Sequence, residues 1–189
     1  MSGKRFETVL GDDKLRFETS PGLFSPQGPD AGTVAMLARV DLQPGMKLLD
    51  LGCGWGLVGA WAAMRTDPAL VWMVDSDPAA VACAKANLKL NGVEGAHVLV
   101  SDGLSAVDET GFDLILSNPP YHADFAVPKA FIEKGFNRLK LGGTLWMVTR
   151  REAWHRNRLT AIFGGCRVHR DGGYFVFEAV KKRATYANR

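Results

Sequence analysis

Short apolar runs alternate with segments of helical periodicity along the middle of the chain, and this alternation restricts the possible folds more than any other feature. The apolar runs predict buried strands over 47–52, 70–75, 96–102, 112–118 and 144–149. Between them, the spacing of apolar residues predicts helices over 56–65, 77–92, 127–143 and 151–165. Because strand and helix alternate, the connections are crossovers, and we expect a parallel sheet.

The C-terminal part departs from this alternation. Residues 166–182 read as two strands joined by a tight Asp-Gly-Gly turn. The expected fold is therefore α/β and doubly wound, with a mostly parallel seven-stranded, Rossmann-like sheet that ends in an antiparallel hairpin. We expect the 189 residues to form a single domain, with a lead segment (1–40), a core (41–182) and a basic tail (183–189).

Composition excludes several classes of protein. The chain is 47% hydrophobic and 23% charged, as in an ordinary globular protein. It has no apolar run near the roughly 20 residues that span a bilayer, and its first residues lack an apolar signal core. Three cysteines without a Cys-x-x-Cys pair indicate reduced thiols, and no His or Cys spacing predicts a metal site. We therefore expect a cytoplasmic protein without a membrane partner.

The net charge of +3 is unevenly distributed. Residues 147–189 contain ten Lys and Arg against three acidic residues, so the rest of the chain is net negative. A basic end of this kind can meet the phosphate backbone of a nucleic acid. On charge alone, a solvated helix face with a charged tail explains the pattern equally well.

A glycine-rich loop, LLDLGCGWGLVG, follows the first predicted strand and opens a helix. Glycines let the backbone approach a ligand closely, and a helix N-terminus offers free N–H groups. The spacing of Gly54, Gly56 and Gly59 matches the dinucleotide fingerprint, so a dehydrogenase is one interpretation. Asp50 argues against it, because a carboxylate just before the glycines would repel a pyrophosphate and attract an ammonium group.

Carboxylates also end the next two predicted strands. Asp75 can accept hydrogen bonds from both hydroxyls of a ribose. It could instead cap a helix, but Asp77 is better placed for that role. Asp102 with Gly103 can meet an adenine amino group, although a simple turn is a serious alternative. Together with Asp50, these side chains point into the crevice where doubly wound sheets bind ligands. A zwitterionic adenosine derivative fits this arrangement better than a dinucleotide does.

The predicted strand 112–118 runs into the turn Asn118-Pro119-Pro120-Tyr121. Neither proline can donate a backbone hydrogen bond, so the chain must leave the sheet there. With this turn, the motifs DLGCGWG, VDSDPAAVACAKANL, SDG and SNPPYH resemble, in order and spacing, class I S-adenosylmethionine-dependent methyltransferases of the amino-methylating type.

Two further segments narrow the resemblance. SPGLFSPQGPDAGTVAML (20–37) and GGYFVFEAVKK (172–182) are similar to parts of the small-domain ribosomal RNA guanine-N2 methyltransferases. The resemblance covers about residues 20–182. Well-known bacterial members carry an additional N-terminal domain that helps to engage RNA, so this chain is expected to be a single-domain version.

The resemblance implies a Rossmann-like methyltransferase fold, S-adenosylmethionine as the cofactor and RNA, ribosomal RNA in particular, as the partner. The residues that it implies for cofactor binding are Asp50, Gly52, Cys53, Gly54, Gly56, Asp75, Ser76, Asp102, Gly103 and Asn118. Those that it implies for catalysis are Asn118, Pro119, Pro120 and Tyr121.

The chemistry of the turn suits an exocyclic base amine, whose lone pair is delocalised into the ring. The Asn118 side-chain oxygen and the Pro119 carbonyl can hold the two N–H groups, which favours tetrahedral character and aims the nitrogen at the methyl group. Tyr121 can stack on a base. No general base is needed before transfer, since the product ammonium can lose its proton afterwards.

Other functions share part of this pattern. Release-factor glutamine methyltransferases use the same turn on a planar amide, and the basic C-terminal segment and the Pro-Gly-Leu-Phe-Ser lead favour RNA over that alternative. DNA adenine methylation uses it too, but we find no segment for a separate target-recognition domain. A non-catalytic cofactor-binding or RNA-binding module would not need an amine clamp, that is, the pair of acceptors on Asn118 and Pro119 that hold the amine.

Overall fold

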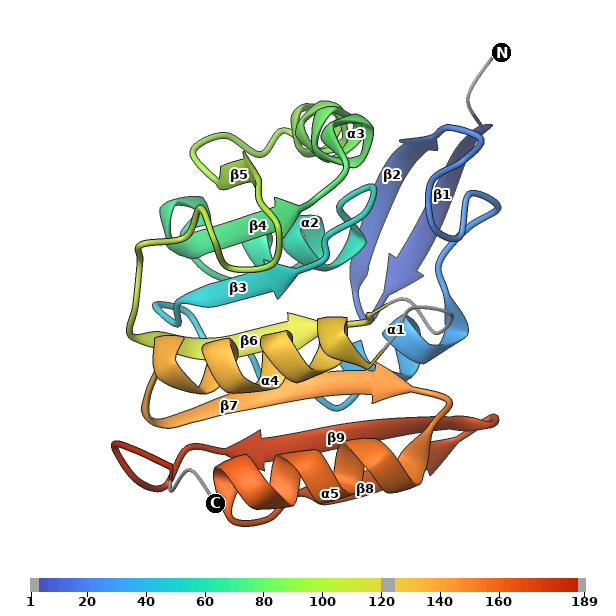
Figure 1. Ribbon diagram of the computed structural model, residues 1–189. Helices are drawn as coiled ribbons and strands as arrows, with labels where there is room; N and C mark the ends of the chain where they lie inside the picture. The colour runs from blue at the N-terminus through green and yellow to red at the C-terminus, as the bar shows by residue number, and fades with distance from the viewer. Residues whose placement is uncertain (1–3, 120–124, 187–189) are drawn as a thin grey trace.

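The computed structural model describes residues 4–119 and 125–186 (Figure 1). Pro120 and Tyr121, two of the four residues expected to form the catalytic turn, lie outside these described residues. The expectations placed on their side chains therefore stay predictions.

Within the described residues, seven strands form one sheet in the order β5-β4-β3-β6-β7-β9-β8. The strands from β3 to β7 are parallel, and β9 runs antiparallel to both β7 and β8. The expected doubly wound sheet with an antiparallel C-terminal hairpin is therefore confirmed. The strands span Leu48–Leu51 (β3), Val71–Asp75 (β4), His97–Val100 (β5), Phe112–Ser117 (β6), Leu139–Thr149 (β7), Arg167–Asp171 (β8) and Tyr174–Val180 (β9).

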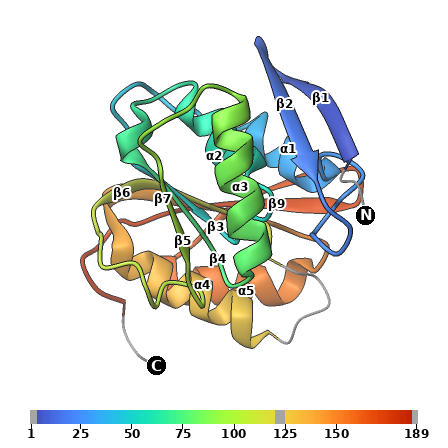
Figure 2. The same cartoon turned by 90° about the horizontal axis from the view of Figure 1, so that it is seen from above.

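Helices cover both faces of this sheet (Figures 1 and 2). One face carries α1, α2 and α3, and the other carries α4 and α5. They span Ala31–Leu37 (α1), Leu57–Ala63 (α2), Pro78–Leu90 (α3), Ala126–Arg138 (α4) and Glu152–Phe163 (α5). Among the described residues, no helix combines the length and apolar character needed to cross a membrane.

The central strands are apolar on both faces because side chains alternate across a sheet that is covered twice. In β6, Leu114 and Leu116 pack in the cluster under α1, α2 and α3, whereas Ile115 packs in the cluster under α4 and α5. The same alternation places Leu48 and Leu49 of β3 in opposite layers. This double burial explains why the strands appear in the sequence as nearly continuous apolar runs.

Two predicted elements differ from the structure. The helix expected over 127–143 ends at Arg138, and Leu139 already has the extended backbone that begins β7. The strand expected over 96–102 is shorter and is not fully buried, since β5 lies at the edge of the sheet and Val100 is 48% exposed. Residues 139–143 do not continue the predicted helix, because their backbone pairs with neighbouring strands instead. Leu139 pairs with Phe112 of β6, and the backbone of residues 142 and 143 binds Lys181, which directly follows β9.

The lead segment contains structure that the sequence reading did not anticipate. Strands β1 (Lys4–Leu10) and β2 (Asp13–Thr19) form an antiparallel hairpin, and helix α1 follows it. Leu15 and Phe17 of β2 are fully buried against the cluster that contains α2 and α3. The hairpin lies beside α3 and the end of the sheet where the parallel strands terminate (Figure 1).

Asn87 of α3 and Asn91, the C-cap of this helix, bind the backbone of β2 as a neighbouring strand would. The Asn87 amide accepts from Glu18 N at 2.8 Å and donates to Glu18 O at 2.9 Å and to Trp55 O at 2.8 Å. Asn91 accepts from Arg16 N at 2.9 Å and donates to Arg16 O at 2.7 Å. Asn87 is buried, whereas Asn91 is partly open to water.

This pair of asparagines gives a test of how the hairpin is held. Asn87→Ala should lower the free energy of unfolding by about 2–3 kcal/mol, because it leaves buried backbone groups without partners. The matched change Asn91→Ala should cost less than about 1 kcal/mol, because water can replace the lost amide. Urea denaturation of both variants measures the difference. Equal losses would show that burial of Asn87 is not what holds β2 against α3.

Candidate active site

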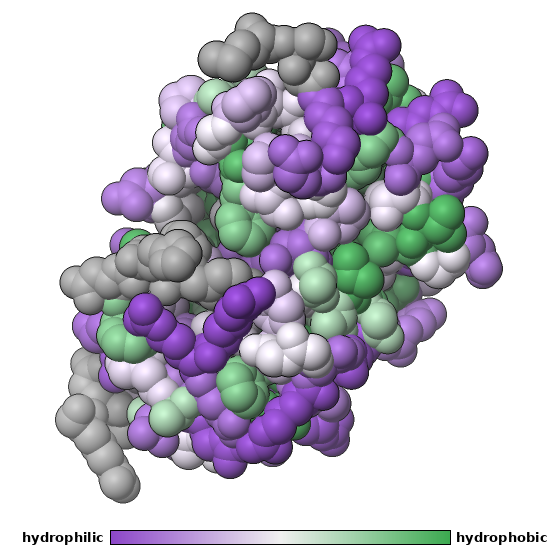
Figure 3. Space-filling view, turned by 90° about the vertical axis from the view of Figure 1, so that its right-hand side faces the viewer, coloured by the Kyte–Doolittle hydropathy of each residue, from purple (hydrophilic) through white to green (hydrophobic). Residues whose placement is uncertain are grey.

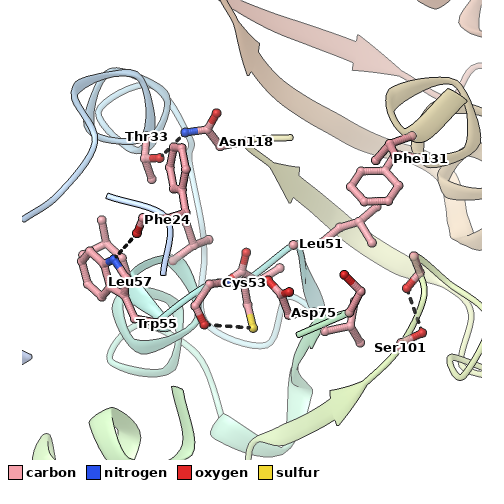
Figure 4. A pocket seen from close by; sticks show the side chains of 18 of the residues that line it. Phe24, Thr33, Leu51, Cys53, Trp55, Leu57, Asp75, Ser101, Asn118 and Phe131 are labelled. Atoms are coloured by element: carbon pink, nitrogen blue, oxygen red, sulfur yellow. Dashed lines mark hydrogen bonds between the residues drawn. The ribbon is translucent and has the colours of Figure 1, made fainter. Parts of the chain in front are cut away.

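A cavity of about 300 Å³ lies where β3, β4, β5 and β6 end, and the lead segment covers part of it. Figure 3 views the molecule from the side toward which these strands point. In Figure 4, Asn118, Thr33 and Phe24 lie on one side of the cavity and Phe131 and Ser101 on the other. The cavity is lined by nine of the residues expected at the cofactor site: Asp50, Gly52, Cys53, Gly54, Asp75, Ser76, Asp102, Gly103 and Asn118.

Gly56 was expected at the same site but does not line the cavity. It begins α2 with a φ of 94°, and a Cβ placed there would approach Ala84 Cβ and Met73 Cε at 3.0 and 3.1 Å. As the N-cap of α2, Gly56 therefore adopts a left-handed backbone conformation and allows close packing against α3 and β4.

Asp50 is buried at the floor of the cavity. Its Oδ2 accepts a hydrogen bond of 3.0 Å from the backbone N–H of Gly59 in α2. Burial raises the pKa of the Asp50 carboxyl to about 8. The hydrogen bond from Gly59 lowers this pKa only in part, and the nearby charge of Asp75 raises it further. The group is thus held ready to ionise when a positive charge arrives beside it.

The glycine-rich loop follows directly after Asp50. The backbone N–H groups of Gly52 and Cys53 both donate to Val74 O at 2.9 Å, and Gly54 N donates to Asp75 Oδ2 at 2.8 Å. Gly54 has a φ of 52°, and a Cβ there would meet no protein atom within 4 Å. Burial raises the pKa of the Cys53 thiol, so this side chain is a small neutral wall rather than a nucleophile.

Asp75 is fixed at the end of β4 by two backbone donors. Besides Gly54 N, it accepts from Asp77 N at 3.0 Å through its other oxygen. Asp77 is the N-cap of α3, with its side chain accepting from Ala79 N at 2.8 Å. The structure therefore assigns the capping role to Asp77 and leaves Asp75 facing the cavity, as the sequence reading expected.

The end of β5 contributes Asp102 and Gly103 together with Ser101, a lining residue that the sequence reading missed. Ser101 Oγ donates to Gly103 O at 2.9 Å and accepts from Ala106 N at 3.0 Å, which fixes the turn. The ring of Phe131, from α4, lies 3.3 Å from the position of a Cβ at Gly103. A polar turn and an aromatic wall thus meet at this side of the cavity.

Asn118 follows β6 and contacts the start of α1. Its Nδ2 donates to Asp30 Oδ1 and to Thr33 Oγ1, each at 2.8 Å, and Figure 4 draws the contact with Thr33. The sequence reading missed both Asp30 and Thr33, although an Asp three residues before a Thr at the start of a helix is a recognisable cap signal. Pro119, the next residue, is buried.

Phe24 is 45% exposed at the mouth of the cavity. Its backbone carbonyl accepts from Trp55 Nε1 at 3.0 Å, which ties the lead segment to the glycine-rich loop. This link was not visible in the sequence, where the two residues lie in separate motifs.

Much of the charge of the basic C-terminal segment (147–189) is paired. The arginines in ion pairs with nearby carboxylates are Arg156 and Arg170 with Glu152, Arg158 with Glu133, and Arg167 with Glu178. Arg151 is exposed and lies over the ring of Phe125 at 5.2 Å. Hydrophilic side chains dominate the lower part of the face in Figure 3, where α5 and the β8–β9 hairpin lie.

The strand order and the cavity at the strand ends define a Rossmann-like methyltransferase domain. The chain belongs to the methyltransferase small domain family, whose sequence model matches residues 14–178.

Named relatives agree with this family. The "Ribosomal RNA small subunit methyltransferase C" of Pseudomonas putida (strain F1) is 33% identical over 183 residues, which cover 94% of this chain and 54% of the relative. The "Ribosomal RNA large subunit methyltransferase G" of Streptomyces griseus is 35% identical over 169 residues, covering 85% and 44%. This chain therefore spans about half the length of the curated relatives that it matches.

Solved structures show the same fold. The T. thermophilus 16S rRNA N2 G1207 methyltransferase RsmC, in complex with AdoMet and guanosine, superposes with a TM-score of 0.85 at 28% identity, covering 96% of this chain and 51% of that one. The ribosomal protein L11 methylase of Lactobacillus delbrueckii subsp. bulgaricus has a TM-score of 0.69 at 18% identity, covering 80% and 79%. The second likeness concerns the fold alone.

The raised pKa of Asp50 predicts a specific pH dependence of stability. The unfolded chain releases the Asp50 proton near pH 4, whereas the folded protein keeps it up to about pH 8. Between these values the folded state binds more protons, so the free energy of unfolding falls as pH rises. Asp50→Asn removes the titrating group and should flatten this part of the profile.

Chemical denaturation of the wild type and of Asp50→Asn between pH 5 and pH 9 measures the effect. We expect the stability of the wild type relative to the variant to decrease steadily until about pH 8 and then to level off. A difference between the two proteins that does not change with pH would contradict the raised pKa.

Proposed function

We propose that this chain is an S-adenosylmethionine-dependent N-methyltransferase that acts on an exocyclic base amine of RNA, specifically guanine N2 of ribosomal RNA. The observation that carries the proposal is the position of Asn118, the residue before Pro119, on a cavity that Asp50, Asp75 and Asp102 also line from three neighbouring strand ends. The relatives with RNA methyltransferase names support the same activity.

The chemistry of the cavity fits the cofactor residue by residue. Asp50 accepts the ammonium group, and the ammonium in turn stabilises the ionised form of this buried carboxyl. Asp75, held by two backbone N–H groups, has lone pairs left for the ribose hydroxyls. Asp102 and Ser101 supply polar contacts to the adenine, and Phe131 supplies an apolar wall. When bound, S-adenosylmethionine supplies an electrophilic methyl group on a positively charged sulfur.

Asn118 and Pro119 hold the acceptor. The side-chain oxygen of Asn118 and the backbone carbonyl of Pro119 accept hydrogen bonds from the two N–H groups of the amine. This contact draws the nitrogen lone pair out of conjugation and orients it, and oriented electrostatic contacts of this kind contribute several kcal/mol. Stacking of the base on Tyr121 belongs to the same proposal and concerns a residue outside the described part of the chain.

RNA is the proposed partner of the surface beside the cavity. Arg151 is exposed where α5 begins, whereas Arg156 on the same helix is paired with Glu152. An unneutralised guanidinium gains more from a phosphate than one that already has a carboxylate partner. We therefore assign the phosphate contact to Arg151 rather than to the whole basic segment.

The catalytic role of Asn118 predicts a large effect of a small change. Asn118→Ala should lower the single-turnover rate of methyl transfer at least about 100-fold, or about 2.7 kcal/mol, because the amine loses one of its two acceptors. Asn137→Ala, the same change at an exposed residue of α4 that does not line the cavity, serves as the control and should keep the wild-type rate.

The assay uses S-adenosylmethionine with a labelled methyl group, ribosomal RNA and, in a parallel reaction, a protein substrate with a glutamine acceptor. Label in N2-methylguanosine after nuclease digestion is the expected result. Label in glutamine with none in RNA would instead select protein methylation. If Asn118→Ala loses activity only in proportion to its unfolded fraction, the amine clamp is wrong.

The RNA contact has its own measurement. Arg151→Gln should weaken RNA binding and reduce the slope of log Kd against log salt by about one, since one phosphate contact is lost. Arg156→Gln, the matched change at a paired arginine, should leave that slope unchanged. Filter binding over a series of salt concentrations compares the two variants, and identical slopes for both would remove Arg151 from the RNA surface.

A further inference from the structure

The start of α1 holds the side chain of Asn118 from the opposite end of the sequence. Asp30 is the N-cap of α1 and accepts from Thr33 N at 3.1 Å, and the same Oδ1 accepts from Asn118 Nδ2 at 2.8 Å. Thr33 Oγ1 accepts from the same Asn118 nitrogen at 2.8 Å. Both hydrogens of the Asn118 amide nitrogen are thus directed at one turn of one helix.

Hydrogen-bond chemistry decides which end of the Asn118 amide faces α1. An amide can present its NH₂ group or its oxygen, and a hydroxyl such as that of Thr33 accommodates either. A carboxylate only accepts hydrogen bonds, so Asp30 is satisfied by the nitrogen and repels the oxygen. The amide oxygen is therefore turned away from Thr33, as Figure 4 shows.

The carboxylate of Asp30 is itself held in place. Its Oδ2 accepts from the hydroxyl of Tyr174 in β9 at 3.2 Å, and that hydroxyl accepts from Arg150 Nη2 at 2.9 Å. The ring of Tyr174 is buried against α1 at Gly32, where a Cβ would lie 2.5 Å from Tyr174 Cδ1. Helix α1, β9 and the end of β7 thus fix Asp30 from several sides.

We propose that Asp30 is a positioning residue that sets the orientation of the Asn118 amide, so that its oxygen is presented to the N–H of the acceptor amine. The inference rests on the proposed function, in which that oxygen accepts from the amine. Asp30 does not touch the substrate in this account and acts through Asn118. Without Asp30, the amide of Asn118 can rotate and present its NH₂ group to the substrate amine. The N–H groups of that amine are themselves donors, so no hydrogen bond can then form between the two groups.

The same contacts give Arg150 a role different from that of Arg151. Arg150 lies over the ring of Tyr174 at 4.7 Å and donates to its hydroxyl, so it extends the chain of contacts that ends at Asn118. A change at Arg150 would therefore alter the amide network as well as the surface charge.

The decisive variant is Asp30→Asn. Asparagine is as good an N-cap as aspartate and has the same shape, so its oxygen can still cap α1. That oxygen is neutral, however, so it binds Asn118 Nδ2 more weakly than a carboxylate does, and an NH₂ group replaces the oxygen that accepts from Tyr174. We expect the rate of methyl transfer at saturating substrate to fall about tenfold, because the contact that orients Asn118 is weakened. Affinity for S-adenosylmethionine and the melting temperature should stay close to the wild-type values. Asp67→Asn, at the cap of the short 3₁₀ helix Pro68–Leu70, is the matched control and should keep the wild-type rate.

A double-mutant cycle separates positioning from a general structural effect. If Asp30 acts through Asn118, the double variant Asp30→Asn/Asn118→Ala should be no slower than Asn118→Ala alone. Additive losses, or a wild-type rate for Asp30→Asn in a protein that depends on Asn118, would overturn the inference.

A readout that does not depend on activity separates this inference from the proposed function. The side-chain amide protons of Asn118, assigned in NMR spectra by their disappearance in Asn118→Ala, should exchange with water faster in Asp30→Asn than in the wild type. Unchanged exchange would overturn the role of Asp30. Faster exchange in a protein that methylates no RNA would support the orientation of Asn118 by Asp30 and contradict the proposed function instead.

Discussion

The alignment of four parallel strands is the constraint on which the site depends. Because β3, β4, β5 and β6 run in one direction, the residues after each strand meet at one edge of the sheet. Asp50, Asp75, Asp102 and Asn118 lie far apart in sequence and line one cavity for this reason. Short backbone hydrogen bonds, such as those from Gly54 N and Asp77 N to Asp75, then fix the direction of each carboxylate.

The lead segment completes what the strand ends begin. Hairpin β1–β2 is fastened to α3 by Asn87 and Asn91, and the chain then passes Trp55 and reaches α1 beside Asn118. A change in this segment can therefore reach the acceptor side of the cavity without touching β6. In the proposed enzyme, the floor of the cavity binds the cofactor through Asp50, and the lead segment sets the geometry of the residue that holds the acceptor.

The sequence predicted the sheet, and nine of the ten residues predicted to bind the cofactor line one cavity, because the signals for both are local. The apolar runs, the glycine-rich loop, Asp75 and the Asp77 cap each lie within a few residues of one another. The hairpin β1–β2 was missed because its alternating apolar residues stand among many charges and are buried by residues distant in sequence, such as Trp55 and those of α2 and α3. The contact of Asp30 with Asn118 joins residues 88 positions apart, so no local pattern could predict it. Gly56 packs α2 against α3 and β4 instead of lining the cavity, and the motif alone cannot separate these two roles of a glycine; its part in cofactor binding stays a prediction.

Methylation of guanine N2 in ribosomal RNA is the activity that we propose for this chain. The most direct measurement is mass spectrometry of nucleosides from ribosomal RNA of cells that lack the protein, compared with the parent cells. The account predicts the loss of one N2-methylguanosine, restored by the wild-type gene. An unchanged RNA profile together with the loss of a methylated protein glutamine would contradict it.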